Sequence, residues 1–231
     1  MGDLAIISNN CWGADYYRER GLPYNTPTVG LWFYPDDYLA LLSDLRRTLA
    51  RPLTFRSGSS HGPRPYPVGL LGDIEIQFMH YASEDEARAK WERRVARLPA
   101  NDEDLLIKIC DRDGFTAAHL AQFDALPFAQ KIGFLKEGRF DAPYPWARTV
   151  ACDSETVPDG LTLWQITGQT VNFRSPIAPF TLHKESLRDS LRSREIALID
   201  LPAACSRRIR TTVSTINIPI LTAWLNPSGR A

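Results

Sequence analysis

Apolar and polar positions follow two different periods along the first two thirds of the chain. Short apolar or alternating runs predict strands at residues 4–7, 28–34, 73–81, 105–110, 131–137 and 147–153. Helical periodicity and capping residues predict helices at residues 14–20, 35–50, 83–98 and 116–128. Because strands that alternate with helices form mainly parallel sheets, the pattern predicts an α/β fold with a central, mostly parallel sheet flanked by helices.

Two parts of the chain depart from this alternation. Residues 51–69 are rich in Pro, Gly and Ser, and we expect mostly loop there, either a flap over a site or a plain surface excursion. From residue 154 onward the pattern is less regular, with a hairpin expected at 161–175, a helix at 183–199 and a strand or helix at 215–226. We therefore expect a core domain at 1–153 and a less regular C-terminal extension at 154–231, packed on the same domain.

The composition narrows the class of protein. A chain of 231 residues with 44% hydrophobic content can bury a sizeable core. Its 27 basic and 27 acidic residues balance, so no net charge favours nucleic acid or an anionic membrane as a partner. No apolar run approaches the ~20 residues of a membrane span, and the N-terminus lacks the pattern of a signal peptide. We expect a cytoplasmic protein with no membrane span.

Several chemical classes lack support in the sequence. The four cysteines, Cys11, Cys110, Cys152 and Cys205, are far apart and form no C-x-x-C, so we expect free thiols rather than a zinc site or a disulfide framework. No G-x-G-x-x-G follows a strand and no P-loop motif occurs. The four histidines have no spacing typical of a zinc enzyme.

Ordered blocks of the sequence resemble one bacterial family. The blocks are "ISNNCWG", "YNTPTVGLWFYPDDYLALLSDL", "GDIEIQFMHYASEDEARAKWERRVARL", "IKICDRDGF", "FDALPFAQKIGF" and the late "WLN". They are similar to the family catalogued as domain of unknown function 1919, whose members are named exopolysaccharide or capsular polysaccharide biosynthesis proteins. The resemblance covers residues 4–134 well. It implies a place in surface polysaccharide assembly, while the reaction must be argued from a site.

The first candidate site uses Cys11, His80 and Asp111, each of which lies at the end of a predicted strand. Because the carboxyl ends of parallel strands share one edge of a sheet, we expect the three side chains to meet there. A Cys11 thiolate with His80 as base and Asp111 as its orienting acceptor would catalyse acyl transfer or hydrolysis. Asn9 or Asn10 would help to hold the oxyanion. The alternative is that Cys11 packs as a small apolar residue and His80 satisfies a core hydrogen bond.

The second candidate site is the pair Asp111 and Asp113 in "ICDRDG". An apolar strand that ends in Asp-x-Asp is typical of many glycosyltransferases, in which both carboxylates hold a cation that clamps the diphosphate of a sugar nucleotide. This hypothesis predicts Mg²⁺ or Mn²⁺ together with a sugar nucleotide. The alternative is an ordinary turn from strand to helix with Asp113 or Thr116 as the helix cap.

Other residues are candidates for substrate binding. We expect Asn9, Asn10 and Trp12 to contact substrate at the Cys11 loop. Arg94 belongs to a basic helix face, which either is simply solvated or binds a phosphate or an acidic sugar. Aromatic residues also gather in the first 34 positions, where they form either core and rim or a glycan-binding surface: Trp12, Tyr16, Tyr17, Tyr24, Trp32 and Tyr34.

The hypothesis that we favour is a transferase of surface polysaccharide biosynthesis that acts on a glycan or a sugar nucleotide, centred on the Cys11 loop. The first alternative is a cysteine-dependent acyl transferase or hydrolase that uses Cys11, His80 and Asp111. The second is a non-catalytic glycan-binding partner of glycosyltransferases. In that second case, substitution of Cys11 or Asp111 by alanine leaves the function of the pathway intact.

Overall fold

The computed structural model describes residues 4–168, 170–171 and 181–182 of the protein. All of them belong to one compact unit of the chain, residues 1–187. The expected division between residues 153 and 154 stays a prediction. The helix at 183–199, the last element at 215–226 and Cys205 lie outside the described residues.

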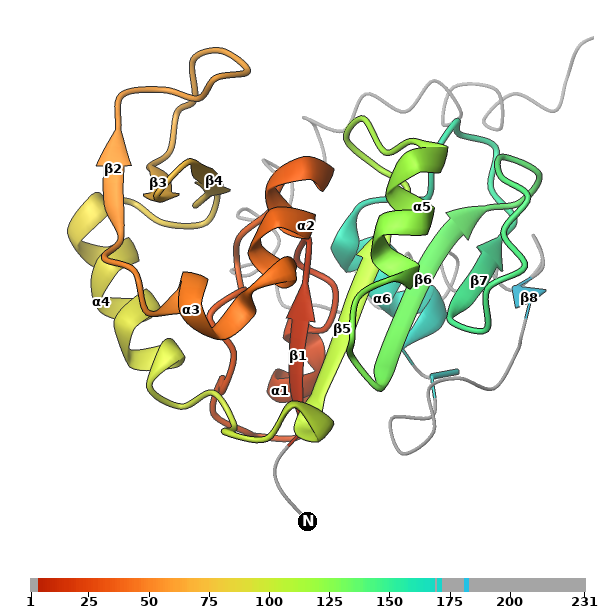
Figure 1. Cartoon of the computed structure of the whole chain (residues 1–231), viewed down its shortest axis with the longest axis horizontal. Coiled ribbons are helices and arrows are strands. Elements are labelled where there is room, and N and C mark those ends of the chain that lie inside the picture. The colour runs from red at the N-terminus through yellow and green to blue at the C-terminus, as the bar shows by residue number, and fades with distance from the viewer. Residues whose placement is uncertain (1–3, 169, 172–180, 183–231) are drawn as a thin grey trace, which may run out of the picture. The chain divides into compact units, whose positions relative to one another are not determined.

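A parallel sheet forms the centre of this unit (Figure 1). Its strands, in spatial order, are β1 (Ala5–Ser8), β5 (Leu105–Cys110), β6 (Gln130–Lys136), β7 (Ala147–Val150) and the short β8 (Thr181–Leu182). Every neighbouring pair is parallel. All residues of β1 and β5 are buried, which explains why these strands are continuous apolar runs rather than alternating ones. The predicted fold class is confirmed.

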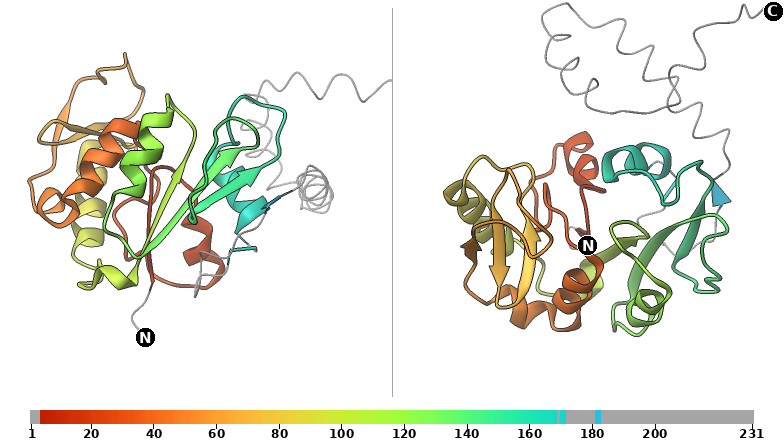
Figure 2. Two further views of the ribbon diagram at one scale, coloured as in Figure 1. Left: turned by 45° about the vertical axis from the view of Figure 1, so that its right-hand side comes forward. Right: turned by 90° about the horizontal axis from the view of Figure 1, so that it is seen from above.

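Helices cover both faces of the parallel sheet (Figures 1 and 2). On one face, α2 (Pro35–Ser43) and α5 (Ala117–Asp124) pack in the hydrophobic cluster that contains Ile7. On the other, α1 (Ala14–Glu19) and α6 (Gly160–Thr167) pack in a cluster with Ile6. Successive side chains of β1 thus point to opposite layers, as the pleat of a strand requires.

A second, antiparallel sheet follows α3 (Leu45–Leu49) in the chain. It contains β2 (Thr54–Arg56), β3 (Val68–Leu71) and β4 (Ile74–Gln77) in that order. The helix α4 (Glu84–Val95) packs against it through an edge contact between Trp91 and Phe78. Residues 51–69, predicted to be mostly loop, therefore include one strand and the start of another.

The predicted strand at 28–34 is wrong, because side chains satisfy the backbone there instead of a ladder. The backbone oxygen of Val29 accepts from the Tyr81 hydroxyl at 2.7 Å and from Arg94 at 2.9 Å. Gly30 has a φ of 75°, which a strand cannot contain. Only Trp32 retains a strand-like contact, an isolated antiparallel bridge to Gln77.

Two other predicted elements differ in the structure. The helix expected at 35–50 is divided into α2 and α3, because Asp44 has φ −147° and ψ 59°. The expected hairpin at 161–175 is wrong in its first part, where α6 forms instead. Asp159 caps α6, since its side chain accepts from the backbone N–H groups of Leu161 and Thr162. A short 3₁₀ turn, Asp102–Asp104, precedes β5.

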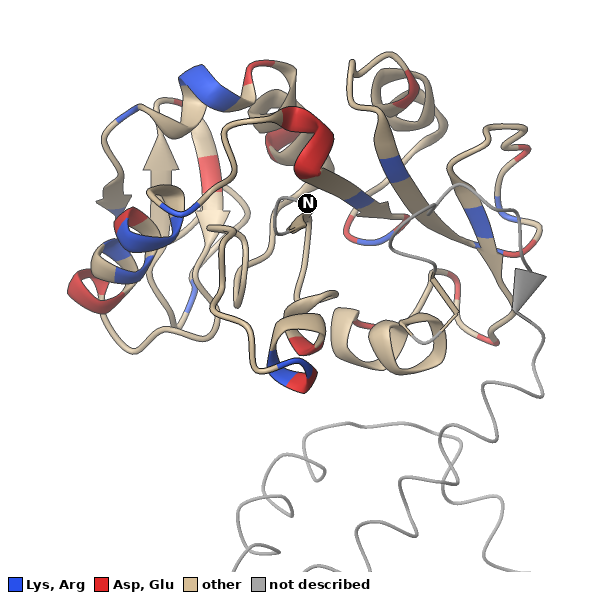
Figure 3. Ribbon diagram, turned by 90° about the horizontal axis from the view of Figure 1, so that it is seen from below, with Lys and Arg blue, Asp and Glu red and all other residues tan. Residues whose placement is uncertain are grey.

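No helix among the described residues is both long enough and apolar enough to span a bilayer. The cysteines that the structure describes, Cys11, Cys110 and Cys152, are free thiols, as predicted. Acidic and basic residues lie next to each other along α4 (Figure 3), in keeping with the balanced net charge of the chain.

Candidate functional site

The candidate site lies where β1 and β5 end, at the loop that leads from β1 into α1. Asn9 is 1% exposed and Asn10 is 7% exposed, so both side-chain amides must find partners inside the protein. The chain then turns at Gly13, whose φ of 88° suits glycine. A side chain there would come within 2.9 Å of Ile6. Space and backbone geometry thus both favour glycine at the start of α1.

Lys108 is the centre of this polar cluster. It lies in β5 directly beside Ser8 in the parallel register, and it is fully buried. Its Nζ donates to the side-chain oxygens of Asn9, at 3.1 Å, and Asn10, at 2.8 Å. Among the described residues no carboxylate forms an ion pair with it. Burial lowers the pKa of Lys108, because an ammonium loses its hydration in the interior.

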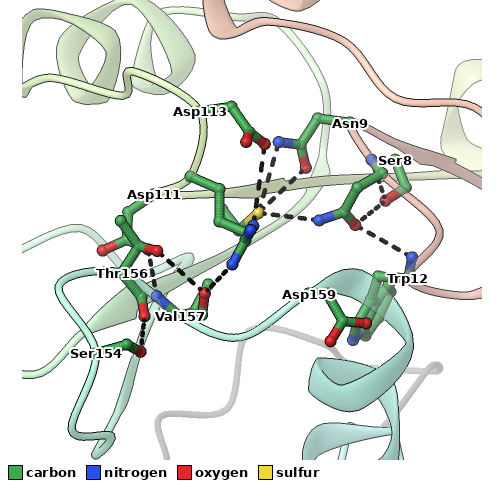
Figure 4. Close-up of polar contacts among 12 residues, drawn as sticks. Ser8, Asn9, Trp12, Asp111, Asp113, Ser154, Thr156, Val157 and Asp159 are labelled. Carbon is green, nitrogen blue, oxygen red and sulfur yellow. Dashed lines mark hydrogen bonds and ion pairs between the residues drawn. The ribbon is translucent and has the colours of Figure 1, made fainter. Parts of the chain in front are cut away.

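The two amides also contact a thiol from the end of β5. Asn9 Nδ2 lies 3.6 Å and Asn10 Nδ2 lies 3.3 Å from the sulfur of Cys110 (Figure 4). Each amide therefore directs its oxygen to Lys108 and its nitrogen to Cys110. This arrangement fixes the orientation of both asparagine side chains, because the donor and acceptor roles cannot be exchanged.

The N-terminus of α6 closes the cluster from the other layer. Asn10 Oδ1 also accepts from the backbone N–H of Trp12 at 3.1 Å. A Cβ on Gly160 would lie only 2.7 Å from both Asn10 Oδ1 and the Trp12 nitrogen. Glycine at position 160 thus allows α6 to approach the loop. Asp159, the N-cap of α6, lies beside Trp12 of that loop (Figure 4).

Trp12 belongs to the core. It is 2% exposed, packs against Phe134 and Trp164 with ring centroids 5.3 and 5.1 Å away, and donates from Nε1 to Thr167 Oγ1 at 2.8 Å. The Trp12 ring therefore has no exposed surface with which to make the expected contact with a substrate. Its role is to join the β1 loop to α6.

The structure does not assemble the expected triad of Cys11, His80 and Asp111. The strand before His80 is β4, which belongs to the antiparallel sheet and not to the parallel one. His80 is an exposed turn residue beyond the end of that strand, and no hydrogen bond joins it to Cys11 or Asp111. The expectation of a shared edge was wrong for His80, because membership of a sheet depends on distant pairing and not on the local pattern.

Cys11 itself is in a poor environment for a thiolate. It is 9% exposed, and its sulfur contacts the backbone oxygen of Leu31 at 3.9 Å. Burial, together with the carboxylates of Asp159 and Asp15, raises the pKa of the thiol to about 11, although the charge of Lys108 opposes the shift. At neutral pH this thiol is protonated, which is the opposite of what a nucleophile needs.

Asp111 has a structural role in the described arrangement. It is completely buried, and it accepts the backbone N–H groups of Val157 and Lys136, both at 2.9 Å. Arg139 forms an ion pair with it at 3.1 Å and also binds its backbone oxygen. The carboxylate thereby joins β5, β6 and the segment before α6, and little of it is left for a cation.

Asp113 faces the cluster from the turn after β5. Its φ of 60° places it in the left-handed region, which Asp tolerates better than most residues. Burial raises the pKa of Asp113, and the charges of Arg112 and Lys108 oppose that shift. Asp111 and Asp113 do not fit a shared cation, because Asp111 is already bound on both oxygens. Within the described residues no group of three potential ligands suits a metal ion.

Arg94 is not on a solvated face. It is 7% exposed, donates to the backbone oxygen of Val29 at 2.9 Å and to the hydroxyl of Tyr81, and lies over the ring of Tyr24 at 4.9 Å. These contacts attach α4 to the loop before Trp32. Arg94 therefore positions this loop, and the described contacts leave it no evident substrate role.

Comparison with known proteins assigns the chain to a family. The family described as domain of unknown function (DUF1919) matches residues 1–142. The chain belongs to the DUF1919 family. An uncharacterized protein of Haemophilus influenzae is similar to it, with 40% identity over 142 residues. That similarity covers 62% of this chain and 64% of the relative, so the chain spans somewhat less than two thirds of the relative that it matches.

The DUF1919 match separates the two sides of the site. The matched residues include the loop after β1, Lys108, Asp111 and Asp113. They do not include α6 or its cap, Asp159. The DUF1919 region thus supplies the polar cluster at the ends of β1 and β5. The segment after residue 142 adds the helix that packs against it.

Sequence reasoning missed Lys108 and Cys110 as site residues. The available signal was a single lysine inside the otherwise apolar run "LLIKIC", where a charged side chain is expensive to bury without a purpose. Arg148 of β7 gives a similar signal, at 1% exposed, but it donates to the backbone oxygens of Pro145 and Ala147 nearby. Of the two, Lys108 alone belongs to the cluster after β1.

We expect Cys11 to need a higher pH for alkylation than Cys152 does. Its thiol pKa is raised to about 11, so the reactive thiolate forms only in alkaline solution, whereas Cys152 is half-buried. Iodoacetamide labelling across pH 7–10, read by peptide mass spectrometry, measures both rates in one sample. Faster labelling of Cys11 than of Cys152 at pH 7 would contradict this expectation and revive the nucleophile hypothesis.

Proposed function

We propose that the protein is a transferase of surface polysaccharide biosynthesis and that the Lys108 cluster binds the anionic part of a sugar nucleotide or a glycan precursor. The observation that carries this proposal is the buried amine of Lys108, whose neighbours among the described residues are two amide oxygens, a thiol and the Trp12 ring, with no carboxylate in an ion pair. Retaining such a charge is costly unless an anion balances it. Because Lys108 itself is fully buried, a substrate phosphate balances its charge from the half-buried mouth of this edge, beside Arg112, and not by direct contact.

The position of the cluster supports the same proposal. In open α/β sheets, ligands bind beyond the carboxyl ends of the strands, which is where Asn9, Asn10 and Asp113 lie. Arg112 adds a second positive charge at this edge, although its Nη1 also donates to the backbone oxygen of Val157 at 2.8 Å. The polysaccharide pathway itself is an expectation from the family resemblance of the sequence, since the matched family is described as a domain of unknown function and the similar protein is uncharacterized.

The cysteine-dependent alternative has weaker support. It needs a base beside Cys11, and the described contacts of that thiol include no histidine. The glycan-binding alternative has support of its own from Trp32 and Tyr34, two half-buried aromatic residues outside this cluster.

Sugar nucleotides should raise the melting temperature of the protein through the Lys108 cluster. A ligand at 100 times its Kd stabilises the folded state by about 2.7 kcal/mol, or roughly 5 °C for a chain of this size. We expect this shift with at least one of UDP-glucose, UDP-N-acetylglucosamine, GDP-mannose and dTDP-glucose. Differential scanning fluorimetry measures it, with Mg²⁺ in one arm and EDTA in the other.

The variant Lys108→Met should lose the shift, because it keeps the length of the side chain and removes the charge. Lys136→Met is the matched control, since the Lys136 ammonium contacts only the neighbouring backbone oxygen of Glu137. An equal shift in Lys108→Met and the parent protein would contradict the proposal. So would the absence of a shift with every sugar nucleotide in both arms.

A further inference from the structure

The outer face of the second sheet gathers side chains that the proposed function does not use. Along β4, Ile74 and Ile76 point into the core while Glu75 and Gln77 point to the other face. Trp32 pairs directly with Gln77 in an antiparallel bridge, so the side chains of this pair lie next to each other on one face. Indole, amide and carboxylate groups therefore share this face.

Aromatic rings form a row along this face. The ring centroid of Tyr34 lies 4.7 Å from that of Trp32 and 3.5 Å from that of His61, which stacks on it at 28°. Trp32 and Tyr34 are half-buried, and His61 is exposed. Part of each ring is thus available to a ligand. We name this set, together with Asp37, Arg64 and Gln77, the Trp32 face.

Glu75 holds the Trp32 face in a fixed arrangement. It is 4% exposed and accepts from Arg56 at 3.0 Å, from the Ser59 hydroxyl at 2.6 Å and from the Ser60 backbone at 2.7 Å. Burial acts to raise the pKa of Glu75, but the hydrogen bonds from Ser59, Ser60 and Gln77 together outweigh it, so the pKa is lowered. Since its charge is fully compensated, Glu75 anchors the loop between β2 and β3 against β4.

Polar atoms on the same face lack hydrogen-bond partners among the described residues. Gln77 is 0% exposed, and its Nε2 donates to Ser59 and Glu75 while its Oε1 has no partner. Arg64 donates from Nη2 to the Tyr34 hydroxyl at 2.7 Å, but its buried Nε is unpaired. Each unsatisfied buried group costs free energy, because it gives up its hydration without gaining a partner. Native proteins usually retain such groups for a reason.

Asp37 adds a carboxylate with spare capacity. Its Oδ1 accepts from the backbone N–H of Glu75 at 2.9 Å, and no hydrogen bond in the described part of the chain uses its Oδ2. Burial and the charge of Glu75 raise the pKa of Asp37, whereas His61 opposes that shift. The Trp32 face thus offers one free carboxylate oxygen, one free amide oxygen and one free guanidinium N–H.

We propose that the Trp32 face is a binding site for a saccharide ring. The apolar C–H surface of the ring packs on Trp32 and Tyr34 and one of its hydroxyls donates to Asp37, while the buried Gln77 oxygen and Arg64 Nε lie beneath them without partners among the described residues. This inference names the glycan-binding part of the proposed function, and for the class of ligand it rests on that function.

The charges of the Trp32 face favour a saccharide over a phosphorylated ligand. Asp37 and Glu75 both place acidic oxygens here, and Arg56 already balances Glu75. A phosphate would meet the carboxylates without a free pair of cations, whereas a hydroxyl both donates and accepts. A half-exposed indole beside carboxylate and amide groups suits a ring that is apolar on its faces and polar at its edge.

Saturation-transfer NMR on the full chain tests this site with methyl glycosides of glucose, galactose, mannose, N-acetylglucosamine and glucuronic acid, and with UDP as a separate probe. We expect transfer to the ring protons of at least one glycoside. Asp37→Asn should weaken its affinity about tenfold or more, because the variant keeps the shape of the side chain and its hydrogen bond to Glu75 but loses the charged acceptor. Trp32→Ala should abolish transfer.

Matched controls lie in the loop between β6 and β7, away from the second sheet. Tyr144→Ala removes a half-buried ring that stacks on Trp146, and Asp141→Asn neutralises an exposed carboxylate, so both should bind like the parent protein. Circular dichroism verifies that each variant is folded. If Trp32→Ala does not fold, the affinity of Asp37→Asn alone tests the saccharide site. Parent-like binding by Asp37→Asn would overturn the inference, as would transfer to UDP alone or to no glycoside. Glycoside binding without any shift by sugar nucleotides would contradict only the transferase proposal.

Discussion

Replacing Asp111 by asparagine lowers the free energy of unfolding by about 3 kcal/mol. The Asp111 carboxylate accepts two backbone N–H groups and pairs with Arg139, all away from solvent. An amide places an N–H where an acceptor is needed, and it removes the negative charge that balances the guanidinium. Urea unfolding followed by circular dichroism measures the loss, without any ligand or metal in the buffer.

Asp113→Asn is the matched control for this prediction. Among the described residues Asp113 makes one ion pair, with Arg112 at 4.0 Å, and asparagine tolerates its left-handed backbone equally well. We expect a change of about 0.5 kcal/mol or less. Equal losses in both variants would refute the structural role of Asp111. An unchanged stability of Asp111→Asn, together with a lost Mg²⁺-dependent shift, would restore the metal hypothesis.

Replacing Trp12 by alanine should cost about 3–5 kcal/mol of stability. The substitution empties a site between Phe134 and Trp164, and it leaves the Thr167 hydroxyl without the indole donor. Since Trp12 lies two residues after Asn10 and its backbone N–H donates to the Asn10 side chain, we expect the sugar-nucleotide shift to fall as well. Thermal and urea unfolding measure the first effect, and scanning fluorimetry measures the second.

Trp32→Ala provides the contrast for the Trp12 prediction. Trp32 is half-buried and is attached by its backbone to Gln77, so its removal should cost less than half as much stability. The two tryptophans thereby separate a core role from a surface role. If Trp12→Ala were as stable as the parent protein, its ring could not be part of the core, and the expected contact with substrate would become tenable again.

Local patterns sufficed for several elements. The apolar runs of β1, β5 and β6 were located within a residue or two, because full burial on both faces leaves a continuous signal. Ser83 caps α4 by accepting from the backbone N–H of Glu86, as the capping-box pattern predicts. These features depend on neighbours within a few residues along the chain.

The sites were harder to predict, because they depend on pairing between distant segments. Asn9 and Asn10 were correctly placed at the end of a strand, yet their partners, Lys108 and Cys110, are about one hundred residues away. The pattern of β4 looked like any other strand. Which sheet it joins was decided by its antiparallel register with β3, and that pairing placed His80 after a strand of the second sheet instead of the parallel one.

By itself, the sequence of this protein determined the fold class, the free thiols and the polar loop after the first strand, since each follows from local periodicity or spacing. Tertiary structure decided which side chains meet. It turned Trp12 and Arg94 inward, because the Trp12 indole donates to Thr167 and the Arg94 guanidinium donates to the backbone oxygen of Val29. It left Lys108 buried beside two amides and Gln77 with an unused oxygen, because packing places these groups together regardless of their distance in the chain.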